Sequence, residues 1–379
     1  MLAAMDALRA AIIIARTPSL VAEHVHALVA ATGSLESAAA IGDGVIPGVE
    51  LPASSRAFLA AIDHAAIDAD LAWLERSGAR IIPCTASEYP PLLASTSRAP
   101  PALYVLGDVA ALTSPQLAMV GARDCSASGR STAQAFAQQF ARNGLTVTSG
   151  LALGIDAASH EGALSANGRT IAVCGCGLDS VYPRRNTALA ARIREQGALV
   201  SEFPPRTQPL PAHFPQRNRV ISGLSFGTLV VEAASTSGSL ITAQCALEQG
   251  REVFAIPGSI HNPLSQGCHK LIREGARLVE SAAEVLSEVT NFLSVQPLAQ
   301  GSNMSGSAAS STCALDKEYE ILLDALGFEP ASIDVLVART AIPGASVASM
   351  LLILELQGRV APHAGGRYGR LLLTKNGQQ

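Results

Sequence analysis

The sequence predicts an α/β protein built on a Rossmann-like, doubly wound and mostly parallel sheet. Short strand-like runs alternate with helical patterns between residues 102 and 256. Most of these runs are apolar throughout, which is typical of strands covered on both faces. A helical stretch precedes this region and a helix-and-hairpin pattern follows it, so we expect several folded parts in the 379 residues.

Residues 1–84 predict an N-terminal helical, SAM-like module. Apolar residues recur every three or four positions over residues 6–15, 19–31 and 54–77, with Gly- and Pro-containing turns between them. Such a module could bind the DNA backbone or a protein partner, or it could be a packing or dimerisation appendage. Nine acidic against five basic residues favour the appendage.

Residues 85–290 predict the sheet domain. The expected strands are residues 102–106, 117–120, 145–148, 170–173, 198–201, 228–231 and 253–256. Helical patterns between them cover residues 129–143, 155–166, 186–196, 219–224 and 240–249. Ligands of such sheets bind beyond the carboxyl ends of the strands, so the turns from strand to helix are where we expect a site.

The last 89 residues predict a linker and a small domain. Residues 291–315 are rich in Ser, Gly and Ala and predict a flexible linker. Residues 316–379 predict a winged-helix-like domain, with helices at 318–326, 331–340 and 346–357 and a hairpin around residues 365–366. The third helix has no Lys or Arg, which favours a protein partner over duplex DNA.

Composition limits the classes of function. The net charge of −4 argues against a generally basic nucleic-acid binder, but residues 85–290 hold fifteen Arg and one Lys, which allows a local patch. Aromatic residues make up only 4% of the chain, so a large base-stacking surface is not expected. Seven scattered cysteines indicate reduced thiols and a cytoplasmic protein, and we expect no metal site. Apolar runs are too short to span a membrane, so we expect no membrane insertion.

The stretch from residue 214 to residue 223 is the strongest candidate for an anion site. It places Arg217, Asn218 and Arg219 at the predicted start of a helix. Free N–H groups and the helix dipole favour anions there, and the planar guanidinium fork suits phosphate. Phe214 precedes this cluster and either stacks on a base or packs as a hydrophobic staple.

The turns after the strands add further candidates. Gly121 allows a tight turn after one strand, and Arg123 follows it. Hydroxyl groups at residues 235–239 precede a helix and predict an anion cradle. Neither the dinucleotide-binding glycine pattern nor the P-loop lysine is present, which excludes those two modes of nucleotide binding. Asp156 and His160 stand four residues apart on a helix, and we interpret them as a structural pair.

Taken together, these segments resemble the DNA-processing protein A (DprA/Smf) family. The resemblance covers about residues 85–290 and departs from the common pattern at His269, where many members have Asn. The matching motifs are VGAR at 120–123, SGLALGIDAASHEGAL at 149–164, TIAVCGCGLDSVYP at 170–183, SEFPP at 201–205, FPQRNRVISGLS at 214–225, VVEAASTSGSLITAQCALEQGREVFAIPG at 230–258 and GCHKLIREGA at 267–276.

The resemblance implies a homodimeric, non-catalytic, cofactor-free protein. Such a protein binds and protects incoming single-stranded DNA and loads it with RecA recombinase during natural transformation. The strand-binding residues that it implies are Gly121, Arg123, Ser149, Gly150, Phe214, Arg217, Asn218, Arg219, Ser237, Gly238, Ser239 and Lys270. Because phosphates are bound without contacts to base edges, binding should be salt-sensitive and largely independent of sequence, with electrostatics outweighing stacking.

A nucleotide phosphoribohydrolase-type enzyme of the lysine-decarboxylase-like Rossmann class is the alternative. Members of that class resemble this sequence in having a phosphate loop beside a catalytic Glu. Glu232, close to the Ser237–Ser239 turn, is the feature that supports this alternative. The arginine-rich helix and the two appended domains favour the DNA-binding interpretation.

Overall fold

The structure of the protein is a computed structural model. It describes residues 6–295, 322, 326, 330–340, 342–356, 359–363 and 366–370. The chain divides into two compact units, Met1–Ala299 and Gln300–Gln379, which are described separately below.

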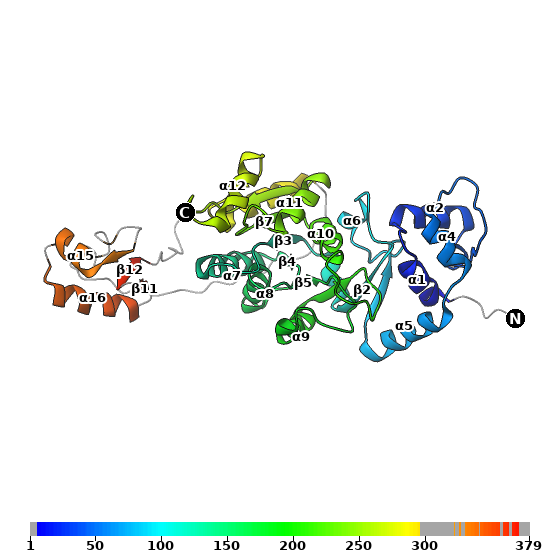
Figure 1. The fold of residues 1–379 in the computed structure, drawn as a ribbon, viewed down its shortest axis with the longest axis horizontal. Helices are drawn as coiled ribbons and strands as arrows, with labels where there is room; N and C mark the ends of the chain where they lie inside the picture. The colour runs from blue at the N-terminus through cyan, green and yellow to red at the C-terminus, as the bar shows by residue number, and fades with distance from the viewer. Residues whose placement is uncertain are drawn as a thin grey trace. The chain divides into compact units, whose positions relative to one another are not determined.

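Across residues 6–295, nine strands form one sheet in the order β1-β2-β6-β5-β4-β3-β7-β8-β9 (Figure 1). β2 pairs antiparallel with β1 and β6, and all other pairings are parallel, which confirms the expected fold class. The strands are β1 (Arg80–Pro83), β2 (Ala102–Gly107), β3 (Gln116–Val120), β4 (Thr146–Ser149), β5 (Thr170–Val173), β6 (Ala198–Ser201), β7 (Gly227–Val230), β8 (Glu252–Ala255) and β9 (Arg277–Leu278). β1 therefore extends the sheet into residues expected to belong to the helical module.

Helices cover both faces of this sheet (Figure 1). One face carries α7 (Ala127–Arg142), α8 (Ile155–Ser165) and α9 (Thr187–Gln196); the other carries α10 (His213–Gly223), α11 (Ser239–Glu248) and α12 (Gln266–Arg273). Right-handed crossovers produce this division because the chain builds outward from β3 in one direction and then returns to build from β7 in the other. The direction reverses between β3 and β7, which opens a crevice at their carboxyl ends.

The start of α10 differs from the sequence prediction. The helix was expected to begin within the cluster of residues 217–219, whereas α10 already begins at His213. Pro215 lies in its first turn, where a backbone N–H has no intrahelical partner to lose. Arg217, Asn218 and Arg219 consequently lie in the second turn of the helix, and their side chains leave it in different directions.

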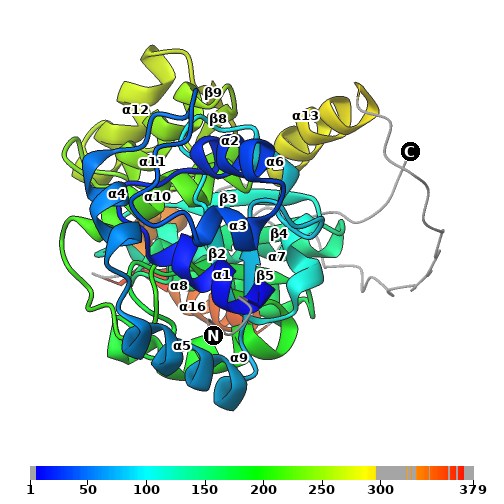
Figure 2. The ribbon, with the colours of Figure 1, turned by 90° about the vertical axis from the view of Figure 1, so that its right-hand side faces the viewer.

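The N-terminal helices gather at the β1–β2 side of the sheet (Figure 2). They are α1 (Ala7–Arg16), α2 (Ala22–Thr32), α3 (Leu35–Ala39), α4 (Ala53–Ala60) and α5 (His64–Ser77). The single helix expected at residues 54–77 is thus two helices, and Asp63 caps the second by accepting a 3.1 Å hydrogen bond from the backbone N–H of Ala66. The buried α1 residues Ile12–Ile14 belong to the same apolar core as β2, so this module and the sheet domain pack as one body.

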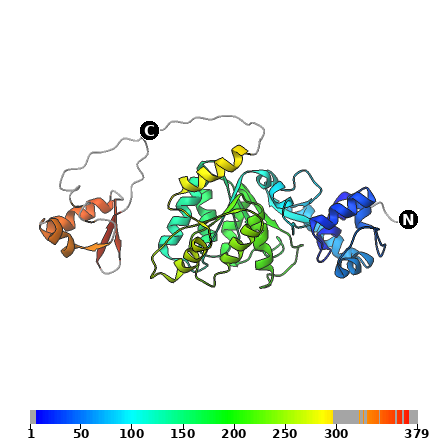
Figure 3. The ribbon, with the colours of Figure 1, turned by 90° about the horizontal axis from the view of Figure 1, so that it is seen from above.

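The second unit is a small winged-helix fold (Figure 3). β10 (Ala331–Ser332), α15 (Ile333–Thr340), α16 (Gly344–Leu356), β11 (Val360–His363) and β12 (Arg367–Arg370) follow in order, and the strands pair as β10-β12-β11. Leu322 and Leu326 belong to its apolar core; the rest of the helix expected at 318–326 lies outside the described residues.

The helix α13 (Ala282–Val295) corrects the expected linker at its start, because residues 291–295 are helical. The remaining linker residues, 296–315, lie outside the described part of the chain. Within the described residues, no helix has both the length and the apolar character needed to cross a bilayer.

We predict that Phe140→Ala strongly destabilises the sheet domain. The Phe140 ring is fully buried between α7 and the sheet and meets the Phe136 ring edge-on at 6.0 Å. Its truncation should lower the free energy of unfolding by about 3–5 kcal/mol in urea titrations. Leu247→Ala on the exposed side of α11 is the control, and equal losses in the two variants would contradict this packing.

Candidate functional site

A cleft of about 620 Å³ lies at the switch point between β3 and β7. Its walls come from the turns after β3, β4, β5 and β7 and from one side of α10. It contains eight of the twelve strand-binding residues predicted from sequence: Gly121, Arg123, Phe214, Arg217, Asn218, Ser237, Gly238 and Ser239. The fold therefore brings together turns that are more than 100 residues apart in the chain.

Arg217 forms the floor of the cleft. Its side chain is buried, and its Nη1 donates to the carbonyl oxygens of Gly150 and Val173, at the ends of β4 and β5. Among the described residues its Nε has no hydrogen-bond partner. Burial lowers the pKa of this guanidinium, and the nearby Asp156 acts in the opposite direction. Arg217 is thus both a cation at the base of the cleft and a structural tie between two strands.

Asp156 balances that cation. Its carboxylate is buried beside Arg217 and accepts hydrogen bonds from the backbone N–H groups of Gly150 (3.1 Å) and Ala152 (3.3 Å). Burial raises the pKa of Asp156, whereas Arg217 lowers it. The expected pair with His160 is absent, since His160 Nδ1 instead lies 2.7 Å from the hydroxyl of Thr170.

The start of α11 forms a cradle of hydroxyl and backbone N–H groups. Ser237 Oγ lies 2.7 Å from Ser239 Oγ, and the backbone N–H of Ser239 points to Ser237 Oγ at 3.4 Å. Asn218 reaches this turn from α10 and donates to the carbonyl oxygen of Gly238 at 3.4 Å. A Cβ atom added at Gly238 would meet no atom of the described residues within 4 Å, so the turn is open on that side. The first N–H groups of α11 bond to oxygens of the same turn, so the helix dipole is the feature that favours an anion here.

An aromatic pair lies at the mouth of the cleft. The rings of Phe214 and Tyr182 are 5.6 Å apart, and Tyr182 is 48% exposed. The guanidinium carbons of Arg123 and Arg217 lie 5.6 and 5.9 Å from the centre of the Phe214 ring. Phe214 lines the cleft and is only partly buried, which is the arrangement that a base-stacking role requires.

Tyr182 is the residue that the sequence prediction missed. It stands in the turn after β5, within a motif that matched the family, but nothing in the sequence pairs it with Phe214. Its position after a strand, in a chain with only five tyrosines, is the signal that could have singled it out.

Four predicted residues lie away from the cleft lining. Ser149 is buried and donates to the carbonyl oxygen of Met119 at 2.6 Å, while Gly150 contributes its backbone groups to Arg217 and Asp156. Arg219 leaves α10 on another side, pairs with Glu202 and lines a second cleft of about 730 Å³. Lys270 on α12 is half exposed and lies 3.9 Å from Glu274. Near it, His269 bonds to the backbone of Gly258.

Glu232 lies behind the cleft. Its two carboxylate oxygens accept from the backbone N–H (2.9 Å) and the hydroxyl (2.6 Å) of Ser126, which begins α7. A Cβ atom at Gly129 would collide with this carboxylate, so the glycine makes room for it. The carboxylate therefore stabilises a helix start. Within the described residues, no group of three His, Cys, Asp or Glu side chains is placed to hold a metal ion.

Comparison with known proteins places this geometry among DNA-processing proteins. A family model described as DNA recombination-mediator protein A matches residues 80–290, and the DprA winged helix domain matches residues 306–366. Protein Smf of Escherichia coli K12 is 48% identical over 306 residues, which is 80% of this chain and 81% of the relative.

Two solved structures are also similar. The X-ray structure of DNA processing protein A from Streptococcus pneumoniae aligns with a TM-score of 0.64 at 37% identity, covering 75% of this chain and 99% of that one. DNA processing protein A from Helicobacter pylori, described for its single-stranded DNA binding mode, aligns with a TM-score of 0.51 at 26% identity, covering 57% of this chain and 96% of that one.

We predict that Gly150→Ala disturbs the floor of the cleft while Gly238→Ala does not. A Cβ atom at Gly150 would collide with the Arg217 guanidinium, whereas Gly238 has open space. Gly150→Ala should lower the free energy of unfolding by about 1–3 kcal/mol, measured by urea denaturation. Gly238→Ala should stay within about 0.5 kcal/mol of the wild type. Wild-type stability in Gly150→Ala would contradict the close packing of Arg217.

We predict that His160 makes the protein less stable in acid. Burial lowers the pKa of His160 to about 3, and the positive charge of Arg217 adds to the effect. Between pH 6.5 and 3 the unfolded chain therefore binds one more proton at this residue than the folded chain. Stability should fall as the pH drops through that window, by up to about 1.4 kcal/mol per pH unit. His160→Gln should show a shallower dependence in thermal denaturation, and identical slopes would contradict the assignment.

Proposed function

This chain belongs to the DprA/Smf family of DNA recombination mediators, and from that premise we propose that its cleft holds single-stranded DNA without reading the base sequence. One observation carries the proposal: a single cleft joins the Arg123 guanidinium, the open start of α11 and the Tyr182–Phe214 pair. The first two suit phosphate, and the aromatic pair suits an unpaired base. The single-stranded DNA binding mode described for the Helicobacter pylori relative supports the same ligand.

The chemistry of the cleft favours binding that does not depend on sequence. Arg123 and the serine hydroxyls at the start of α11 are donors that any phosphate can satisfy. Asp156, an acceptor that could read a base edge, is buried, and its Oδ2 already accepts from two backbone N–H groups. Stacking on Phe214 and Tyr182 tolerates every base, since each base presents a π face. Binding to phosphates should weaken with salt, because releasing counterions from DNA is less favourable when the solution already holds more of them.

We propose that the protein does this without catalysis or a cofactor. The rival enzymatic hypothesis needs Glu232 in the cleft, and the bonding of both its oxygens to Ser126 removes the observation that favoured it. The further steps that we propose are protection of incoming DNA and delivery of the strand to RecA recombinase during natural transformation, by a cytoplasmic homodimer. The family assignment supports them, as does a winged-helix domain whose helix α16 has no Lys or Arg for duplex DNA.

The test is fluorescence anisotropy of a labelled oligo-dT with the full chain at two salt concentrations. Arg123→Glu should weaken binding at least about tenfold at low salt and reduce the salt dependence, because it replaces a cation that binds phosphate with a carboxylate that repels it. Ser237→Asp should do the same by placing a negative charge at the α11 cradle. These variants are preferable to changes at Arg217, whose buried contacts also hold the fold.

Arg142→Glu is the matched control. Arg142 is an exposed arginine at the far end of α7, so this variant carries the same charge change outside the cleft. It should bind oligo-dT like the wild type. Equal losses in Arg142→Glu and Arg123→Glu would indicate a general charge effect and would overturn the cleft as the site.

A further inference from the structure

We propose that the N-terminal helical module positions the single-strand site through Asp70. The carboxylate of Asp70 on α5 holds Arg206, and Arg206 joins the two segments that carry Tyr182 and Phe214. Asp70 is thus a positioning residue that does not contact DNA itself. This inference rests on the proposed function for its consequence on DNA binding, but the contact with Arg206 can be tested separately.

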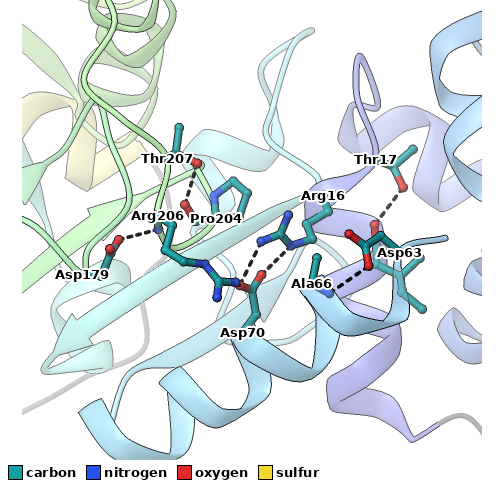
Figure 4. Close-up of polar contacts among 10 residues, drawn as sticks. Arg16, Thr17, Asp63, Ala66, Asp70, Asp179, Pro204, Arg206 and Thr207 are labelled. Carbon is teal, nitrogen blue, oxygen red and sulfur yellow. Dashed lines mark hydrogen bonds and ion pairs between the residues drawn. The ribbon is translucent and has the colours of Figure 1, made fainter.

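Asp70 is fully buried and bonded on both oxygens (Figure 4). Arg16 of α1 donates to it twice, from Nε at 2.6 Å and from Nη2 at 2.9 Å. Arg206 donates from Nη2 at 2.7 Å across 136 residues of sequence. One carboxylate therefore links two helices of the module to a loop of the sheet domain. A buried carboxylate needs such partners, because an unpaired one is strongly unfavourable in the interior.

Arg206 is itself fixed at two points (Figure 4). While its side chain reaches Asp70, its backbone N–H donates to Asp179 Oδ1 at 2.6 Å. Its φ angle is 68°, a left-handed conformation that residues other than glycine keep only where their surroundings hold it. The next residue, Thr207, accepts a 3.0 Å hydrogen bond from the backbone N–H of Gly177. The segment after β6 is therefore bound to the segment after β5.

These two segments carry the aromatic pair. Asp179 lies three residues before Tyr182, and the segment containing Arg206 runs directly into Phe214 at the start of α10. Phe203, at the beginning of that segment, stacks on the ring of His213 at 4.3 Å. A shift of the Arg206 turn would therefore reach both rings, whose centres are 5.6 Å apart. If the rings are already in place before DNA binds, binding has a smaller entropic cost, because fewer side chains must become ordered.

The experiment compares Asp70→Asn and Arg206→Ala in the full chain. Arg206→Ala is the cleaner variant, because Asp70 keeps Arg16 and the module stays paired. Asp68→Asn is the matched control: Asp68 is on the same helix, two residues away, and its side chain, paired with Arg9, is 60% exposed. Hydrogen exchange of residues 177–183 and 203–212 is measured without DNA, and oligo-dT affinity is measured by anisotropy.

We expect faster exchange in both segments and about fivefold weaker binding in Asp70→Asn and Arg206→Ala, with Asp68→Asn unchanged. In a Phe214→Ala background, Arg206→Ala should add little to the loss of affinity, because its effect acts through the aromatic pair. If Arg206→Ala instead weakened binding by unfolding the protein, its loss of affinity would add in full to that of Phe214→Ala.

Unchanged exchange in both segments would overturn the proposal whether or not DNA binds. Faster exchange with undiminished affinity would also overturn it, because the loops would then be held without consequence for the site. Absence of binding by the wild-type protein would overturn the proposed function instead, and exchange of residues 203–212 would still decide whether Asp70 holds the loop.

Discussion

The cleft depends on the hydrogen bonds that the buried guanidinium of Arg217 makes with the backbone. Arg217 connects α10 to the carboxyl ends of β4 and β5 and faces the carboxylate of Asp156. Without it, two buried carbonyl oxygens would lose a hydrogen-bond donor, and the buried carboxylate would lose the cation beside it. The arrangement also requires glycine at position 150, since the guanidinium occupies the space of a side chain. A single residue thus forms the floor of the cleft and requires the glycine beside it.

The sequence predicted the sheet well and the site less completely. The expected strands of residues 102–256 lie within one residue of those observed, because strands buried on both faces have a strong apolar signal. The start of α10 was missed because residues 213–218 lack helical apolar spacing. The sequence suggested that Arg217 and Arg219 form one patch. Two residues of α-helix rotate the side-chain direction by about 200°, so Arg217 lines the first cleft and Arg219 lines the second. Tyr182 and Phe214 meet only through tertiary contacts, which sequence spacing does not encode.

Two helix starts, one beside the cleft and one lining it, have different roles. At α7 the start is filled by the protein's own carboxylate, Glu232, which bonds to Ser126. At α11 the start lines the cleft, and the hydroxyls of Ser237 and Ser239 bond to each other there. An acidic residue close to an anion cradle suggested an enzyme, but its hydrogen bonds show that it stabilises a helix. The same helix dipole therefore stabilises a contact within the fold at α7 and, in the function that we propose, favours a bound phosphate at α11.

The antiparallel strand β2 has a consequence for the order in which the chain folds during synthesis. β2 ends at Gly107, yet it pairs with β6, which ends at Ser201. As the chain leaves the ribosome, the Arg16–Asp70 pair and the β1–β2 pairing can form early, because all of their residues have emerged. The free edge of β2 then stays unpaired until nearly 100 further residues have been synthesised, and an unpaired strand edge can pair with other chains and cause aggregation. The N-terminal helices would shield the apolar face of that waiting pair until the rest of the sheet arrives.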